Sequence, residues 1–127
     1  MPARVDHVID GDTLIVTIGD RQERIRLSRI NAPEIKAACP EEARRGLGAK
    51  AYMERLVRAS PIVALRSPTI WWWRRDNYGR LVAEVRATSP AHPGQGGPDL
   101  GAVMVRAGHA RWWWPFTPKP TWCGGTS

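Results

Sequence analysis

The sequence predicts a small OB-type β-barrel with helices, an α+β fold, and three observations support this prediction. Three short β-rich segments come first, then a helical segment, then two more strands and a second helix. A length of 127 residues suits one domain. Hydrophobic residues at 43% and charged residues at 24% are typical of a globular chain. A disordered chain is therefore excluded.

Strands are expected where β-branched residues cluster or where apolar and polar residues alternate. These segments are residues 4–9, 13–18, 23–30, 62–66 and 80–87. Pro and Gly dominate residues 89–98, so a flexible loop is expected there. The barrel domain is expected to occupy residues 1–114, followed by a tail over residues 115–127.

Two helices are expected, over residues 40–58 and 100–107. Pro40 suits the first turn of the first helix, and Asp99 suits the cap of the second. Gly108 is expected to end the second helix. Gly46 and Gly48 weaken the first helix, since each costs about 1 kcal/mol relative to Ala.

The charge of the chain favours a polyanionic partner. Nineteen Lys and Arg against twelve Asp and Glu leave a net charge of +7. Most of these cations are Arg, whose guanidinium group forms bidentate hydrogen bonds with phosphate. No apolar run approaches the roughly 20 residues of a membrane span. Binding to a membrane surface would need a basic amphipathic helix, which the sequence does not offer. Nucleic acid is the expected partner.

Two acidic positions and two arginines stand out as candidates for chemistry. Asp12 lies in an Asp-Gly-Asp turn between two strands, and Glu34 follows the break that ends the third strand. Arg26 lies within a strand, and Arg80 begins one. Phosphodiester hydrolysis needs an oxygen-lined cation, a base for water and donors for the charge on phosphorus. Taken alone, these residues give little weight to such a site, because Asp-Gly pairs mostly form turns and arginines on strands are mostly solvated.

The order and spacing of four segments give these residues more weight. Residues 8–13 (VIDGDT), 25–34 (IRLSRINAPE), 76–80 (DNYGR) and 100–110 resemble the staphylococcal nuclease family, over about residues 9–110. Each motif is weak alone, and together they are specific. The resemblance implies an OB barrel with helices and a metal-dependent endonuclease that hydrolyses DNA or RNA.

The resemblance also implies roles for individual residues. Asp12 would ligate Ca²⁺, and Ala32 would add its backbone carbonyl. Glu34 would be the general base for the attacking water. Arg26 and Arg80 would be the paired guanidiniums that bind the phosphate and stabilise the transition state.

Further positions extend the expected site. Tyr78 would lie near the nucleotide phosphates, and Trp114 is the best candidate for an aromatic beside the base. Asp10 would lie next to the metal ligands without contacting the cation itself. Asn31 departs from the family, whose active members usually carry a metal-binding aspartate there. An amide keeps an oxygen ligand and removes one negative charge, so Ca²⁺ should bind more weakly.

A catalytically inactive relative is the competing interpretation. Such a module would bind nucleic acid or a protein partner, and Asn31 favours it. The presence of Glu34, Arg26 and Arg80 favours an active enzyme instead, because a relative used only for binding would be free to lose these three residues.

The sequence leaves the cysteines and tryptophans open. Cys39 and Cys123 are either paired or independent thiols; a bridge would indicate a secreted or periplasmic protein, and free thiols a cytoplasmic one. No signal peptide is visible at the start. Six of the seven Trp form two triplets, at 71–73 and 112–114, which either stack on bases or form core and contact surfaces.

Overall fold

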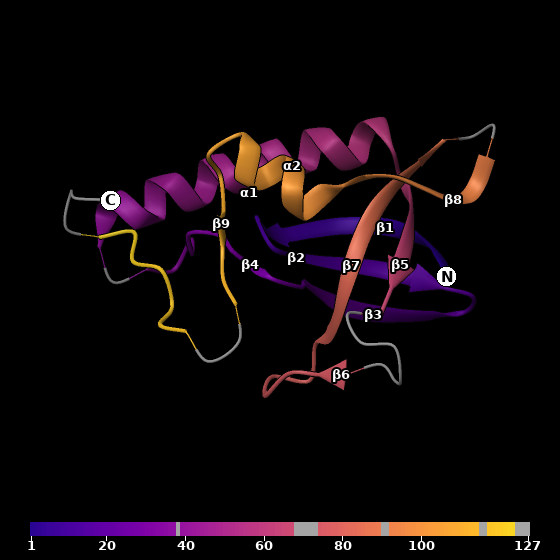
Figure 1. Cartoon of the computed structure of the whole chain (residues 1–127), viewed down its shortest axis with the longest axis horizontal. Coiled ribbons are helices and arrows are strands. Elements are labelled where there is room, and N and C mark those ends of the chain that lie inside the picture. Colours follow the sequence, from indigo (N-terminus) through magenta and orange to yellow (C-terminus); the bar gives the residue numbers. More distant parts are fainter. Residues whose placement is uncertain (38, 68–73, 90–91, 115–116, 124–127) are drawn as a thin grey trace.

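A closed barrel of five strands forms the body of the protein (Figure 1). The strands are β1 (Pro2–Asp10), β2 (Thr13–Ile18), β3 (Arg21–Leu27), β5 (Ile62–Arg66) and β7 (Leu81–Ser89). They follow the order β3-β2-β1-β5-β7, and a parallel pairing of β3 with β7 closes the ring. This computed structural model describes residues 1–37, 39–67, 74–89, 92–114 and 117–123. The expected OB-type barrel with helices is confirmed.

Four further strands are described: β4 (Ile30–Asn31), β6 (Arg74–Arg75), β8 (His92–Asp99) and β9 (Arg111–Trp112). The single strand expected over residues 23–30 is wrong, because Arg29 adopts a left-handed backbone (φ 67°) that separates β3 from β4. β4 then pairs with β9 in a separate sheet.

The loop expected over residues 89–98 is also wrong, because β8 pairs with β7 through most of this segment. A strand ladder uses backbone groups, so a composition rich in Gly does not prevent it. Proline within a sheet is tolerated on an edge strand, where a missing N–H leaves no partner unsatisfied.

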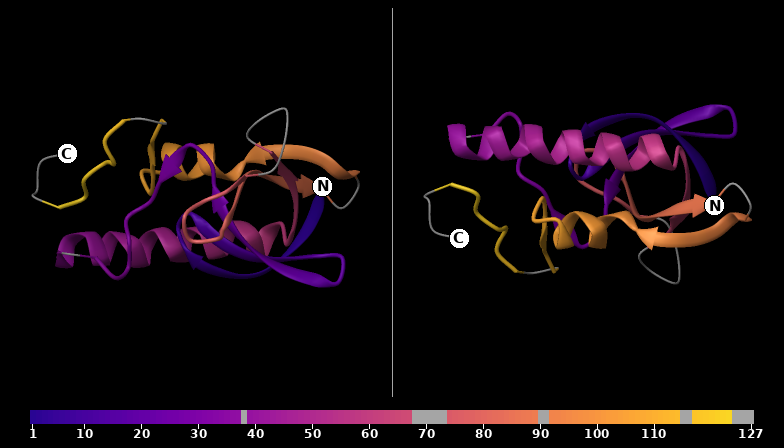
Figure 2. Two further views of the ribbon diagram at one scale, coloured as in Figure 1. Left: turned by 90° about the horizontal axis from the view of Figure 1, so that it is seen from below. Right: turned by 90° about the horizontal axis from the view of Figure 1, so that it is seen from above.

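Two helices lie against the barrel (Figure 2). Helix α1 (Pro40–Ala59) begins at the expected proline, and α2 (Leu100–Arg106) begins after Asp99, whose carboxylate accepts the N–H groups of Gly101 and Ala102. Gly108 ends this segment with a left-handed backbone (φ 81°). The expected helix starts and this cap are confirmed.

The barrel interior is filled by fully buried aliphatic side chains that alternate along the strands. The largest are Leu14, Val16, Ile25, Leu27, Ile30, Val63 and Val85, joined by Met53 of α1 and Met104 of α2. Both helices therefore close the same core, and the loops between strands are left to build a site.

Gly46 and Gly48 of α1 differ in what a side chain would meet. A Cβ at Gly46 would lie 2.7 Å from the carbonyl carbon and oxygen of Glu34, whereas the nearest atom to a Cβ at Gly48 is His109 Cε1 at 3.8 Å. Gly46 therefore allows α1 to pack directly on the backbone of the Glu34 loop. Both glycines were predicted to weaken the helix. The structure shows that close packing requires glycine at position 46 and that a side chain would fit at position 48.

We predict opposite effects of alanine at these two positions. Gly46→Ala should lower the free energy of unfolding by about 1–3 kcal/mol, because the backbone of Glu34 cannot move away without strain. Gly48→Ala should raise it by about 0.5–1 kcal/mol through helix propensity. Urea denaturation of both variants measures the two values. Effects of the same sign would contradict this account of Gly46.

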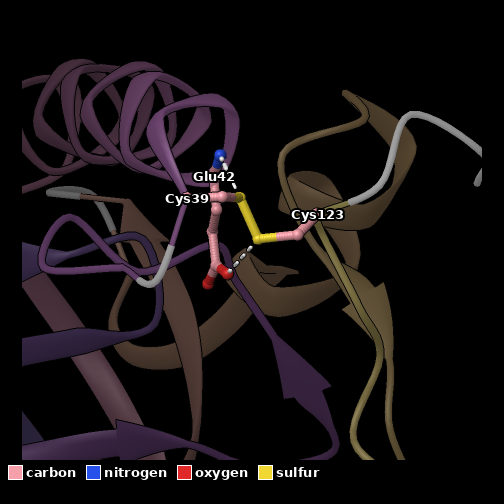
Figure 3. Close-up of side chains that lie close together, drawn as sticks. All are labelled: Cys39, Glu42 and Cys123. Atoms are coloured by element: carbon pink, nitrogen blue, oxygen red, sulfur yellow. Dashed lines mark hydrogen bonds between the residues drawn. A yellow bond between two sulfur atoms is a disulfide. The ribbon is translucent and has the colours of Figure 1, made fainter.

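A disulfide ties the end of the chain to the start of α1. Cys39 caps the helix and bonds to Cys123, 84 positions away, with Cα atoms 6.1 Å apart (Figure 3). Glu42 lies beside the bridge: its N–H faces Cys39 Sγ at 3.4 Å, and its Oε1 lies 3.6 Å from Cys123 Sγ. Residues 117–123, called the strap below, are thereby held against the body of the protein.

We predict that the bridge contributes measurably to stability. A crosslink between residues so far apart restricts the unfolded chain, which typically stabilises a fold by about 2–4 kcal/mol. Cys39→Ser/Cys123→Ser should lose that amount in urea denaturation. Without reductant, thiol titration of the denatured wild type should find no free thiol, and two free thiols would contradict the bridge.

Candidate active site

A pocket of about 420 Å³ opens where the β1–β2 turn, β3, the segment after β4, the turn before β7, the segment after β9 and the strap meet. It is lined by carboxylates, cations, an amide and two aromatic rings. The lining residues are Asp10, Asp12, Arg24, Arg26, Asn31, Glu34, Tyr78, Arg80, Trp113 and Lys119. The pocket contains most of the expected site residues.

The tight turn between β1 and β2 directs Asp12 into the protein. Asp12 is only 6% exposed, and its N–H donates to Asp10 Oδ1 at 3.0 Å. A Cβ at Gly11 would lie 2.8 Å from Ala49 Cβ and 2.9 Å from Ala32 Cβ, so glycine is required for the turn to reach Ala32. Burial, followed by the negative charge of Asp12, raises the pKa of Asp10 to about 7.

The Asp12 carboxylate joins three segments. Its Oδ2 accepts the N–H of Ala32 at 2.9 Å and lies 3.5 Å from Arg26, while its Oδ1 accepts the hydroxyl of Thr13 at 3.1 Å. These contacts fix the distance between the turn and the segment that carries Asn31.

Arg26 extends from β3, where it pairs with Thr13 of β2. Its guanidinium donates to the carbonyls of Leu27 and Ile30 and faces Asp12. A guanidinium has five N–H donors, so these contacts orient the group and leave donors for a ligand in the pocket. The position of Arg26 near Asp12 follows from this strand register, because Thr13 is the residue after Asp12.

Arg80 is held by the turn that precedes β7. Asp76 accepts the backbone N–H groups of Tyr78 and Arg80 through Oδ1 and the Arg80 Nε through Oδ2 at 2.6 Å. Burial raises the pKa of Asp76, but these hydrogen bonds outweigh it and hold the pKa below its ordinary value. Arg80 also donates to Thr13 Oγ1 at 3.3 Å, which brings it to the same end of the barrel as Arg26.

Glu34 presents an exposed carboxylate at the mouth of the pocket. Its backbone N–H donates to Glu42 Oε2 at 2.9 Å, and α1 packs on its carbonyl at Gly46. Its side chain pairs with Lys119 of the strap at 3.1 Å, and both partners are about half exposed. A pair so exposed contributes about 1 kcal/mol or less, so it leaves the carboxylate available.

Asn31 lies on β4 and is 3% exposed. Its Oδ1 accepts the indole N–H of Trp122 at 2.9 Å, a hydrogen bond between residues 91 positions apart. Trp122 is 6% exposed and therefore anchors the strap as a buried side chain. The oxygen expected to face a cation is thus already bound to a donor.

The aromatic residues divide between the pocket and the outer surface. Tyr78 lines the pocket, and the Arg80 guanidinium lies 5.2 Å from its ring centre. From the second Trp triplet, Trp113 lines the pocket, whereas Trp114 is 54% exposed and stacks on Trp112 with ring centres 6.0 Å apart. The first triplet lies outside the described residues.

The donor set fits a hard divalent cation. Asp12 offers a carboxylate oxygen with Asp10 beside it, Asn31 offers an amide oxygen, and Ala32 follows with its backbone carbonyl. Ca²⁺ takes ligands of these kinds. Each engaged oxygen of Asp12 and Asn31 keeps a lone pair, although Arg26 competes electrostatically beside Asp12.

Three residues at the site were not among the predicted site residues: Trp113 and Lys119, which line the pocket, and Trp122, which contacts Asn31. Lys119 and Trp122 belong to the strap, and Trp113 follows β9, where its N–H donates to the carbonyl of Arg29. A cysteine next to Trp122 was the one signal that the tail is anchored. Arg24 also lines the pocket, although strand alternation gave no reason to separate it from surface arginines.

Comparison with known proteins agrees with this geometry. The sequence profile described as "Staphylococcal nuclease homologue" matches residues 24–120. An "Uncharacterized endonuclease" of Escherichia coli O157:H7 is 34% identical over 107 residues, which cover 84% of this chain and 58% of that protein. A "Micrococcal nuclease" of Shigella flexneri is 30% identical over 118 residues, covering 92% and 60%. The chain therefore spans about three fifths of the length of these curated relatives.

The profile match covers most of the chain, including the segments that carry Arg26, Glu34 and Arg80. The barrel closed by β3 and β7 and capped by two helices is the architecture that the motif order indicated. On both grounds, the chain belongs to the staphylococcal nuclease family.

Proposed function

We propose that the protein is a metal-dependent endonuclease that hydrolyses phosphodiester bonds of DNA or RNA. The observation that carries this proposal is the pocket itself, in which Asp12, Arg26, Glu34 and Arg80 come together from four separate segments. The net charge of +7 supports a nucleic-acid substrate. Among the described residues no helix is long and apolar enough to cross a membrane.

We infer that two arginines, Arg26 and Arg80, bind the phosphate of the substrate. Arg26 is fixed by two carbonyls and Asp12, and Arg80 is fixed by Asp76 and Thr13, so neither has to be ordered when a substrate arrives. Donors that are oriented in advance stabilise the extra negative charge that develops on a pentacoordinate phosphorus. Lys119 adds a mobile cation at the mouth of the same pocket.

Glu34 acts as the general base. Its backbone is held by Glu42 and by the contact at Gly46, while its carboxylate remains exposed to water at the pocket mouth. In this position the carboxylate orients a water molecule and accepts its proton as the water attacks phosphorus. Lys119 moves from the carboxylate to a substrate phosphate without large cost, because the ion pair is exposed.

Asp12, Asn31 and the carbonyl of Ala32 are the proposed ligands of Ca²⁺, with Asp10 behind them. Bound there, the cation supplies charge neutralisation and polarises a phosphate oxygen. Tyr78 and Trp114 are proposed to contact the nucleotide, Tyr78 at the pocket and Trp114 on the exposed face of the Trp112 stack.

The disulfide supports an oxidising compartment. Bridges between distant cysteines persist in secreted and periplasmic proteins and are rare in the cytoplasm. We therefore propose that the protein acts outside the cytoplasm, where the Cys39–Cys123 bridge keeps the strap in place.

One observation favours a second candidate, an inactive module that binds nucleic acid. Asn31 lacks the charge of an aspartate, and its oxygen is occupied by Trp122. In that case the protein retains single-stranded DNA in a filter-binding assay and cleaves no plasmid DNA with Ca²⁺ present.

We predict that Glu34→Gln lowers cleavage of plasmid and single-stranded DNA by about 10²-fold or more, as expected for loss of a general base. Arg26→Ala and Arg80→Ala should also reduce turnover, because each removes donors to the phosphate. Glu54→Gln on α1, outside the pocket lining, is the matched control. Unchanged turnover in a folded Glu34→Gln protein would exclude Glu34 as the base.

We predict that Asn31→Asp tightens Ca²⁺ binding and raises activity at limiting Ca²⁺. Without Ca²⁺, the added carboxylate is repelled by Asp10 and Asp12, so the melting temperature should fall. With Ca²⁺ the melting temperature should rise with concentration through mass action. A calcium titration of wild type and variant, followed by melting temperature and cleavage rate, checks the predicted changes in affinity, activity and stability. A variant that gains neither affinity nor activity would show that Asn31 does not face the cation.

A further inference from the structure

The hydrogen bond from Trp122 to Asn31 brings the strap to the proposed cation site. The two side chains are buried, and the donor–acceptor distance of 2.9 Å is that of a well-formed hydrogen bond. It reaches one of the three proposed ligands directly, whereas the strap contact from Lys119 to Glu34 is exposed.

The indole is held firmly in this position. The Arg111 guanidinium lies 4.3 Å from its ring centre and also donates to the carbonyl of Thr121 at 2.8 Å. Arg111 pairs with Asn31 across β4 and β9, and the next residue after Trp122 is the bridged Cys123. The donor cannot leave Asn31 without disturbing the strap, the cation–ring contact or the bridge.

The chemistry of the two groups fixes the orientation of the amide. An indole N–H only donates, so the amide atom that faces it is the oxygen. Asparagine has one oxygen, and its NH₂ group donates and cannot ligate a cation. The N–H hydrogen and a cation are both positive, so they compete for the same oxygen.

We propose that Trp122 is a positioning residue that limits cation affinity by holding the single oxygen of Asn31. The inference rests on the proposed function, in which Asn31 is a ligand. It assigns the weakness of the site to two causes, the missing charge and the occupied oxygen. An aspartate would remove the competition, because one carboxylate oxygen can accept the indole N–H while the other faces the cation.

A double-mutant cycle tests this. Wild type, Trp122→Phe, Asn31→Asp and the double variant are titrated with CaCl₂ by calorimetry, as oxidised protein and without substrate. Trp122→Phe should tighten Ca²⁺ binding by about threefold to tenfold in the Asn31 background, the size expected when one competing hydrogen bond is removed. In the Asn31→Asp background the same change should alter affinity by less than about twofold.

The other outcomes separate the possible failures. If Trp122→Phe weakens binding in both backgrounds, Trp122 acts through packing alone and the inference is overturned. If affinity in the Asn31 background is unchanged, the oxygen serves both partners and the inference is also overturned. If none of the four proteins binds Ca²⁺, the proposed cation site fails, and the inference fails with it for that distinct reason.

A separate control measurement shows whether each variant is folded. Melting temperatures in EDTA show whether each variant is folded before titration. If Trp122→Phe does not fold, Trp122 is replaced with β-(3-benzothienyl)alanine, which keeps the fused ring and removes the N–H. The expected gain in affinity and both contrary results are the same for this protein.

Discussion

The site depends on one interaction, the hydrogen bond between the Asp12 carboxylate and the backbone N–H of Ala32. It spans 20 positions of sequence and is buried. The same oxygen faces Arg26, and the neighbouring oxygen accepts from Thr13, which in turn accepts from Arg80. The Asp12 carboxylate therefore links the turn after β1 to the loop after β4, contacts Arg26 directly and reaches Arg80 through Thr13.

The strap adds a second set of constraints that the barrel alone does not provide. Two of its side chains, Trp122 and Lys119, reach Asn31 and Glu34, which lie three positions apart. Glu42 lies between the bridge and the N–H of Glu34, so the start of α1 also supports this loop. In Figure 1 the strap, drawn in yellow, reaches the first turns of α1, away from most of the barrel. The bridge thus joins the two segments that hold Glu34 in place.

The sequence predicted the parts that local rules determine. Asp12, Arg26 and Arg80 lie at one pocket because short turns and strand register restrict where these residues can be placed. The pairing of Thr13 with Arg26 is one example of such a register. Strand β8 could not be foreseen, because its pairing depends on backbone groups that Gly and Pro composition does not reveal. Lys119 and Trp122 could not be foreseen either, because the tail has no periodicity and only the long-range bridge determines its path. The sequence also did not indicate the packing role of Gly46, which arises from α1 crossing a distant loop.

An amide at position 31 has an electrostatic benefit that offsets its cost. The pocket already holds Asp10 and Asp12 in partial burial, and their mutual repulsion contributes to a pKa of Asp10 near neutrality. A third carboxylate in the same enclosure would add to that repulsion whenever no cation is bound. The uncharged Asn31 avoids it and still accepts the indole hydrogen bond that anchors the strap. If the proposed cation site is correct, Asn31 favours the stability of the cation-free protein at the expense of cation affinity, which is a trade-off between stability and activity at one buried position.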